Sequence, residues 1–249
     1  MMIGRRVYGL AGILMGAAEL AFCNFAAMAH PAPGHFPTME YLGLFSDLVL
    51  IAGGIAMSLG RRIAGIGAIA LAALFVLMLA LQFPAILKGW TISVTWEEAA
   101  EPTAMAVGAL CAWSLLGEGD DAGRAQVARI ARIVFGLCLI AFGISHFAYL
   151  KYTATLVPAW LPPSQIFWAR ATGVVHIAAG LAILSGVQAR LGAVLLTAMF
   201  VTFGLLVWLP ATIHDPHRYS NWSETTTTWL LVAAAWCVAD SLANGSRRG

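Results

Sequence analysis

Two histidines that interrupt apolar sequence are the first candidates for chemistry in this chain. His146 lies near the far end of the apolar segment 130–150, and His176 lies within the apolar segment 166–185. Ionisable side chains are costly in hydrocarbon, so at that depth they usually face a bundle interior, a cavity or a ligand. An imidazole there can bind a ligand or transfer a proton. The alternative is a packing histidine that donates to a neighbouring carbonyl, and the sequence leaves both interpretations open.

Two further charged residues lie within apolar sequence. Arg170 is about half a helical turn from His176, so it either extends to the outer surface or pairs with Glu224 or an anionic ligand. Asp47 stands at similar depth in the first half of the chain. Because a buried carboxylate needs a proton, a cation or a hydrogen-bond donor, Asp47 is a candidate ligand-binding residue.

Carboxylates follow tryptophans at the start of two apolar segments. Glu98 and Glu224 lie in the sequences WEEAAEP and WSETTTT, shortly after Trp96 and Trp222 respectively. A carboxylate at a helix start accepts from free backbone N–H groups and favours the positive end of the macrodipole, and tryptophan suits a membrane interface. This structural role is the favoured interpretation. A ligand-binding role for Glu98 and Trp222, and a catalytic role for Glu224, is the alternative.

Metal or haem chemistry has weaker support. The loop IHDPHRYSNW holds His214, Asp215 and His217 at a spacing that matches no compact metal-site signature, so we expect a solvated loop. A haem between His146 and His176 is disfavoured, because one of them is expected to lie nearer the outer surface than the other. We therefore expect neither a metal nor a haem.

The elements that must position these residues are membrane helices. The chain has 249 residues, of which 60% are hydrophobic and 10% charged, and its mean hydropathy is +0.82. Such a composition excludes an ordinary soluble domain and predicts a polytopic membrane protein whose surroundings are the lipid bilayer. A net charge of +2, without a basic patch, gives no reason to expect a nucleic-acid partner. The four cysteines lie in apolar segments, where a buried free thiol is the default.

Eight segments are long and apolar enough to cross a bilayer, which predicts an all-α protein with eight transmembrane helices. The segments are 5–28, 41–59, 63–87, 97–116, 130–150, 166–185, 190–210 and 223–243. The first segment starts with Arg5 and Arg6 and ends in AAMA, which is similar to a signal peptide. Glu19 interrupts its apolar region, so we interpret it as the first transmembrane helix.

The distribution of basic residues predicts the orientation. Ten lysines and arginines fall on the side of both termini, and four fall on the other side. By the positive-inside rule both termini are cytoplasmic, in a multi-pass protein of the bacterial cytoplasmic membrane. All six histidines then lie in outer loops or in the middle to outer parts of helices, so any chemistry opens toward the outer face.

The two halves of the chain repeat each other in register. At a shift of 127 residues, Gly9, Gly16 and Glu19 match Gly136, Gly143 and His146, and at a shift of 126 residues Trp96, Glu98 and Cys111 match Trp222, Glu224 and Cys237. A nearly constant shift through four segments predicts two four-helix units of the same orientation, related by an axis along the membrane normal. The units are 1–117 and 129–249, joined by a cytoplasmic linker at 118–128. We expect the site in the second unit, with the first as its scaffold.

Several strings in the second unit resemble the DoxX family of four-helix membrane proteins. They are His146-Phe147, LVPAWLPP, Trp168, Thr172-Gly173 and Gly180-Leu181, together with the closing sequence Asn221-Trp222-x-Glu224. The resemblance covers about 129–243, and the first unit shares it only through the repeat, with Glu19 in place of His146. The resemblance implies a fusion of two DoxX-like units. The DoxX family is associated with membrane redox systems, and its members include a subunit of a thiosulfate:quinone oxidoreductase.

Three functions remain open. The first is an accessory subunit or small enzyme that handles a quinone or another lipophilic molecule in the outer half of the bundle, with His146, His176, Arg170 and Glu224 in one unit and Glu19, Asp47 and Glu98 in the other. The second is a small-solute or proton-coupled carrier, in which Asp47 couples protons. The third is a structural subunit that docks partner subunits of a larger membrane complex.

Overall fold

A computed structural model describes residues 3–22, 37–117 and 121–245. Within these ranges the chain forms helices and no strand, which confirms the all-α prediction. The helices are α1 (Ile3–Phe22), α2 (Pro37–Ser58), α3 (Arg61–Lys88), α4 (Ser93–Ser114), α5 (Asp121–Ala148), α6 (Leu150–Leu156), α7 (Gln165–Ser185), α8 (Ala189–Phe203), the π-helical turn η2 (Gly204–Trp208), α9 (Leu209–His214) and α10 (Tyr219–Gly245).

Each of the eight predicted segments corresponds to helix among the described residues, but the boundaries differ from the prediction. Helices α4 and α10 begin at Ser93 and Tyr219, four residues before the predicted starts at 97 and 223. Helix α5 begins at Asp121, so most of the predicted linker 118–128 is helical. Its polar first turns extend the helix beyond the apolar segment, because hydropathy marks the part of a helix that suits lipid and not its ends.

Six stretches of the described chain are long and apolar enough to cross a membrane. They are Tyr41–Ser58, Arg61–Lys88, Ala122–Ala148, Gln165–Ser185, Ala189–His214 and Tyr219–Ala243. Helices α1 and α4 are not among them: α1 contains two arginines and Glu19, and α4 contains three glutamates. Helix α4 lies in the middle of the molecule and packs against α3, α5 and α10, so its sequence need not be apolar enough to face lipid.

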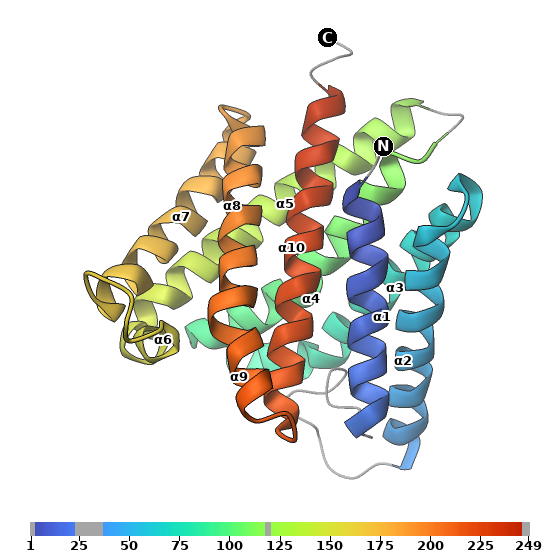
Figure 1. Cartoon of the computed structure of the whole chain (residues 1–249). Coiled ribbons are helices and arrows are strands. Elements are labelled where there is room, and N and C mark those ends of the chain that lie inside the picture. The colour runs from blue at the N-terminus through green and yellow to red at the C-terminus, as the bar shows by residue number, and fades with distance from the viewer. Residues whose placement is uncertain (1–2, 23–36, 118–120, 246–249) are drawn as a thin grey trace.

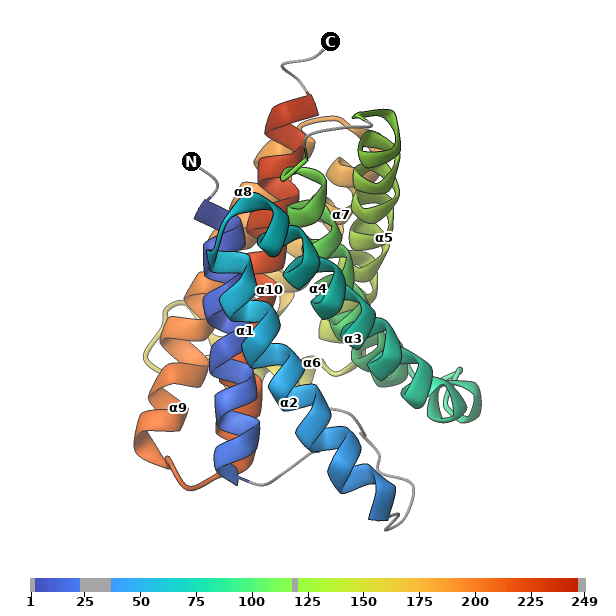
Figure 2. The same ribbon diagram turned by 90° about the vertical axis from the view of Figure 1, so that its right-hand side faces the viewer.

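The helices are arranged as two rings that share α4 and α10 (Figures 1 and 2). In the first ring, successive contacts join α1, α2, α3, α4 and α10, and α10 returns to α1. In the second ring, they join α5, α7, α8, α10 and α4, and α4 returns to α5. This differs from two separate four-helix bundles, because the first helix of each unit packs against the last helix of the other.

The contact between α4 and α10 shows how the two units are related. A Cβ on Gly108 of α4 would lie 2.6 Å from the Cα of Ala234 of α10, and these two positions correspond at the shift of 126 residues. Cys111 and Cys237, which correspond in the same way, are both fully buried and interact with each other. Only residues on a two-fold axis contact their own counterparts, so the pseudo-axis runs between α4 and α10 along the helices.

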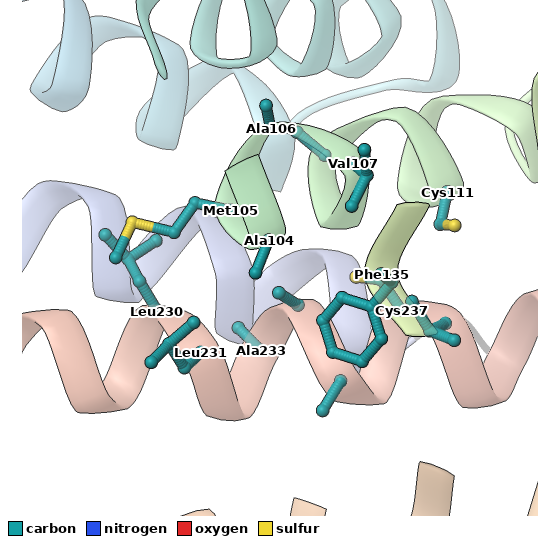
Figure 3. Close-up of a cluster of buried hydrophobic side chains, with 14 of the residues drawn as sticks. Ala104, Met105, Ala106, Val107, Cys111, Phe135, Leu230, Leu231, Ala233 and Cys237 are labelled. Atoms are coloured by element: carbon teal, nitrogen blue, oxygen red, sulfur yellow. The ribbon is translucent and has the colours of Figure 1, made fainter. Parts of the chain in front are cut away.

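The core lies where these shared helices meet α5 (Figure 3). Ala104, Cys111, Ala233 and Cys237 line the crossing of α4 and α10, and the buried ring of Phe135 packs there from α5. Small side chains let the two backbones approach closely, as is common in membrane helix packing. The cysteines Cys111, Cys138 and Cys237 are buried and free, whereas Cys23 lies outside the described residues.

Equivalent tryptophans close the loops before the two shared helices. The indole Nε1 of Trp96 donates to the carbonyl of Trp90 at 2.8 Å, and that of Trp222 donates to the carbonyl of Pro216 at 2.9 Å. The two donors, Trp96 and Trp222, correspond at a shift of 126 residues, and so do the two acceptors, Trp90 and Pro216. Both loops lie at the end of the molecule opposite the two termini, where α6 and α9 also lie (Figure 1). The candidate site residues gather toward this end, which we call the loop end.

Candidate functional site

His146 and His176 meet inside the second ring. Their ring centroids are 4.9 Å apart and their planes are inclined by 46°. His176 is buried and His146 is partly buried. The two histidines, 30 residues apart in the sequence, are therefore brought into contact. The rings also leave no room for a porphyrin plane between them, since axial imidazoles stand on opposite faces of a haem.

Contacts between α5 and α7 fix the two imidazoles. The Nδ1 of His146 lies 3.1 Å from the Thr172 hydroxyl and 3.3 Å from the Ala169 carbonyl. The Nδ1 of His176 lies 2.9 Å from the Thr172 carbonyl. Because a carbonyl only accepts, His176 must carry its hydrogen on Nδ1, and in the neutral ring its Nε2 is then an acceptor. Thr172 therefore orients both rings, one through its side chain and one through its backbone.

Aromatic side chains form the walls around the histidine pair. The ring of His176 lies 5.8 Å from Phe142, 5.5 Å from Phe200 and 6.2 Å from Phe203, measured between centroids. Phe203 also stacks on His146 at 6.3 Å with an interplanar angle of 22°. In the described part of the chain, the hydrogen bonds of both imidazoles involve Nδ1 only. Neither Nε2 forms a hydrogen bond with a described residue, and phenylalanine rings lie around the pair.

Two local features of the backbone hold these side chains in place. A Cβ on Gly143 would lie 2.8 Å from the Gly173 carbonyl, so glycine lets α5 and α7 approach beside His146. The π-helical turn Gly204–Trp208 follows Phe203 directly, and Gly204 packs against Trp229 of α10. Such π-turns inside α-helices often occur at functional sites, because the wider turn redirects neighbouring side chains.

Arg170 does not join the histidine pair. Its side chain is exposed and forms no hydrogen bond or ion pair with any residue that the structure describes. Of the two alternatives, the structure thus shows the extended side chain and not an ion pair with Glu224. Arg170 and His176 lie on different faces of α7, as their spacing predicted.

The glutamates near the start of α4 and α10 do not cap these helices. Because α4 and α10 begin earlier than predicted, Glu98 and Glu224 lie in their second turns, and the N-cap position of α4, Ile92, has no side-chain cap. The capping interpretation was therefore wrong. Instead, the carboxylates of Glu97, Glu101 and Glu224 lie close enough together to repel one another when they are ionised.

This carboxylate group lies beside α5, near the residue before His146. The Ser145 hydroxyl donates to the Ser93 carbonyl at 3.3 Å, and the Glu97 carboxylate lies near that hydroxyl. Glu224 is exposed at the loop end. Trp222 donates to the Pro216 carbonyl, so its indole holds the loop and does not contact the histidine pair.

A second polar cluster lies in the first ring. Glu19 is fully buried, and the Tyr219 hydroxyl lies 2.7 Å and 2.9 Å from its two carboxylate oxygens. Asp47 is also buried and lies near Tyr219. Its Oδ1 is 3.4 Å from the Ser46 hydroxyl, and its Oδ2 has no hydrogen-bond partner among the described residues. Glu19 therefore faces the bundle interior, at the position that corresponds to His146.

The loop between α9 and α10 is separate from both clusters. His214, Asp215 and His217 are exposed, in agreement with the expected solvated loop. Among the described residues, no group of three or more His, Cys, Asp or Glu side chains is placed to hold a metal ion. His30 and His35 lie outside the described residues.

Comparison with known proteins locates one family. Residues 135–239 match the sequence profile of a domain of unknown function, DUF8561. The match runs from the middle of α5 into α10 and includes both histidines and their three aromatic neighbours. No curated protein and no solved structure matches the chain.

Tyr219 and the phenylalanines Phe142, Phe200 and Phe203 are site residues that the sequence did not indicate. Each reads as an ordinary apolar or interfacial residue, and only the contacts of three helices bring the phenylalanines together. The sequence did indicate that a buried carboxylate at Glu19 would need a hydrogen-bond donor. The sequence could not name that donor, which lies 200 residues away.

Proposed function

We propose that this chain is a DoxX-like membrane protein that binds the head group of a quinol or a related lipophilic hydroxyl compound in the second ring. The contact between His146 and His176 within phenylalanine walls carries this proposal. A quinol ring is flat and apolar with hydroxyl donors, so it stacks on aromatic side chains and donates to an imidazole Nε2. A quinol is also the membrane-soluble compound that DoxX-like redox systems would use.

The carboxylates at the loop end extend this proposal to protons. When a partner subunit's redox centre oxidises the quinol, each hydroxyl loses one proton as two electrons leave. His176 Nε2 would accept one proton, and the carboxylates of Glu97 and the exposed Glu224 would carry it toward the loop end. In this role the chain is an accessory subunit that binds the quinol and conducts its protons, while the partner accepts the electrons.

The membrane arrangement belongs to the same proposal. Helices α1 and α4 join the six apolar stretches to make eight transmembrane helices, with both termini cytoplasmic in a bacterial membrane. The arginines near the starts of α1, α3 and α8 support this orientation, since they lie at the end that carries the termini. The loop end then faces outward, and protons leave on that side.

Quinone analysis of the purified protein tests the proposal. We expect organic extracts of the wild-type protein in mild detergent to contain quinone, and a short-chain quinol to bind at the histidine pair. His176→Leu keeps an apolar side chain in the site but removes the acceptor, so quinol affinity should fall about tenfold. The control is Glu19→Gln, which changes the position of the first ring that corresponds to His146. It should leave quinol affinity within about twofold. Absence of bound quinone, together with unchanged quinol binding in His146→Ala and His176→Leu, would reject the function.

A proton-coupled carrier is the second candidate, because Asp47 has a buried carboxylate oxygen without a partner among the described residues. A buried carboxylate in that state can bind a proton during a transport cycle. Solute uptake into proteoliposomes that responds to a pH gradient and is lost in Asp47→Asn would favour this function. Uptake that Asp47→Asn leaves unchanged would remove its main support.

A further inference from the structure

A cationic cavity lies at the opposite end of the molecule from the histidine pair. Its volume is about 390 Å³, and residues from the first turns of α3, the end of α4 and the start of α5 line it. Three of these are the arginines Arg61, Arg62 and Arg124, and no acidic residue is among the described lining residues. Three guanidinium groups around one cavity form a site for an anion with several oxygens.

Arg124 is held in position at the cavity wall. Its guanidinium carbon lies 4.5 Å from the centroid of the Trp113 ring, and its Nη1 donates to the Trp113 carbonyl at 3.2 Å. The stacked guanidinium is therefore ordered before any ligand binds. Pre-ordering reduces the side-chain entropy that anion binding would otherwise cost.

The start of α3 adds to the positive potential. Gly60 precedes the helix and provides no side-chain cap, and the cavity is lined by the first turn at Arg61 and Arg62 and by the next turn at Gly65. Uncapped N–H groups and the helix macrodipole favour an anion beside arginine side chains.

An exposed apolar stripe leads from the cavity along α3. Ile66 and Ile69 belong to the cavity lining and are 64% and 48% exposed. The same face continues through Ala73, Val76, Ala80 and Phe83, which are all exposed. A cationic head site that continues into a lipid-facing apolar stripe fits an amphiphile with a phosphate head and an acyl chain.

We propose that this cavity binds the phosphate head group of an anionic phospholipid of the cytoplasmic leaflet, with an acyl chain along α3. Basic pockets between transmembrane helices at that face are suited to such head groups. A free phosphate would satisfy the arginines but not the stripe below them. The second unit lacks the site, because Gln188 and Ala189 stand where the first unit has Arg61 and Arg62. The site is independent of the quinol site, which lies at the loop end.

Native mass spectrometry with added lipid tests this site. We expect the wild-type protein to retain phosphatidylglycerol in preference to phosphatidylcholine. Arg62→Gln, which changes an exposed side chain, should lower the retained fraction, and Arg62→Gln with Arg124→Gln should lower phosphatidylglycerol affinity about tenfold. The matched control is Arg190→Gln near the start of α8, which should bind phosphatidylglycerol as the wild type does. Thermal unfolding of each variant without lipid separates lost binding from lost folding, and Arg62→Gln alone decides the result if the double variant unfolds.

Four results would overturn the proposal. Equal retention of phosphatidylcholine and phosphatidylglycerol would show that charge does not select the lipid, and an equal loss in Arg190→Gln would show that the cavity is not the site. Displacement of phosphatidylglycerol by inorganic phosphate would indicate a free-phosphate site. Glu118, Asp120 and Asp121 follow the cavity residue Gly117 in sequence. Retention of phosphatidylglycerol only after these three are neutralised would mean that the chain itself occupies the cavity.

Discussion

The two rings have equivalent backbone arrangements, but one places an imidazole where the other places a carboxylate. In the second ring, the end of α5 places His146 against Thr172 of α7, its neighbour within the same unit. In the first ring, the corresponding end of α1 places Glu19 against Tyr219 of α10, which belongs to the other unit. The imidazole is surrounded by phenylalanines, whereas the carboxylate is near a second carboxylate, Asp47.

The difference shows which contacts join the two units and which stay within one unit. Tyr219 corresponds to Ser93 at a shift of 126 residues, and Ser93 contributes its backbone carbonyl to Ser145 at the equivalent crossing of α4 and α5. Both crossings are therefore polar, but only the first joins the units through a side chain bonded to a buried charge. The first ring is therefore built as a structural joint, whereas in the second ring the histidine Nε2 atoms form no such bond, as the proposed quinol site requires.

Separating α5 from α7 should have the largest effect on stability and on quinol affinity. A Cβ on Gly180 would lie 2.7 Å from the Gly136 carbonyl, so Gly180→Val must push the helices apart. We expect a loss of about 3 kcal/mol in the free energy of unfolding and at least a tenfold loss in quinol affinity, because Thr172 moves away from His146. Thermal unfolding in detergent and quinol titration measure the two effects.

The matched variant in the first ring is Gly54→Val, whose Cβ would meet the Gly9 carbonyl and, at 2.8 Å, Ile13. It should destabilise the protein by a similar amount while quinol affinity changes by less than about threefold. Equal losses of quinol affinity in both variants would contradict a site confined to the second ring.

A smaller effect is expected when Tyr219 loses its hydroxyl. Tyr219→Phe removes a donor from the fully buried Glu19 carboxylate, which should cost about 2 kcal/mol of unfolding free energy. Combined with Glu19→Gln, the loss should be smaller than the sum of the single losses, because both variants affect one interaction. The counterpart Ser93→Ala should change stability by less than about 0.5 kcal/mol, since Ser93 bonds through its backbone. A full loss in Ser93→Ala would remove the distinction between the two crossings.

The sequence predicted the helices well because bilayer thickness and hydropathy limit where they can lie. It predicted two pseudo-symmetric four-helix bundles, and in the structure the first helix of each unit packs against the last helix of the other. The repeat could not distinguish these arrangements, because closed and interlocked units have the same spacing of glycine, tryptophan and cysteine. Only the contact of Gly108 with Ala234 identifies the shared axis.

The site was predicted in part. His146 and His176 were candidates because of their apolar surroundings, and the structure brings their rings together. Their contact was missed, since the relative height of α5 and α7 depends on the path of α6 and on the close approach at Gly143. Neither of these follows from hydropathy, which carries no information on how far one helix slides along another.

Thr172→Val provides the finest test of the comparison, because it changes one contact of the second ring and leaves the shape of the site. Valine removes the hydroxyl that lies 3.1 Å from His146 Nδ1, while the Ala169 carbonyl at 3.3 Å and the bond from His176 to the Thr172 carbonyl remain. One neutral hydrogen bond contributes about 1 kcal/mol, so quinol affinity should fall about fivefold with little change in thermal stability. Thr172→Ser keeps the hydroxyl and should restore the wild-type affinity. An unchanged affinity in Thr172→Val would show that the backbone alone orients His146, and that the proposed quinol site does not need the threonine hydroxyl.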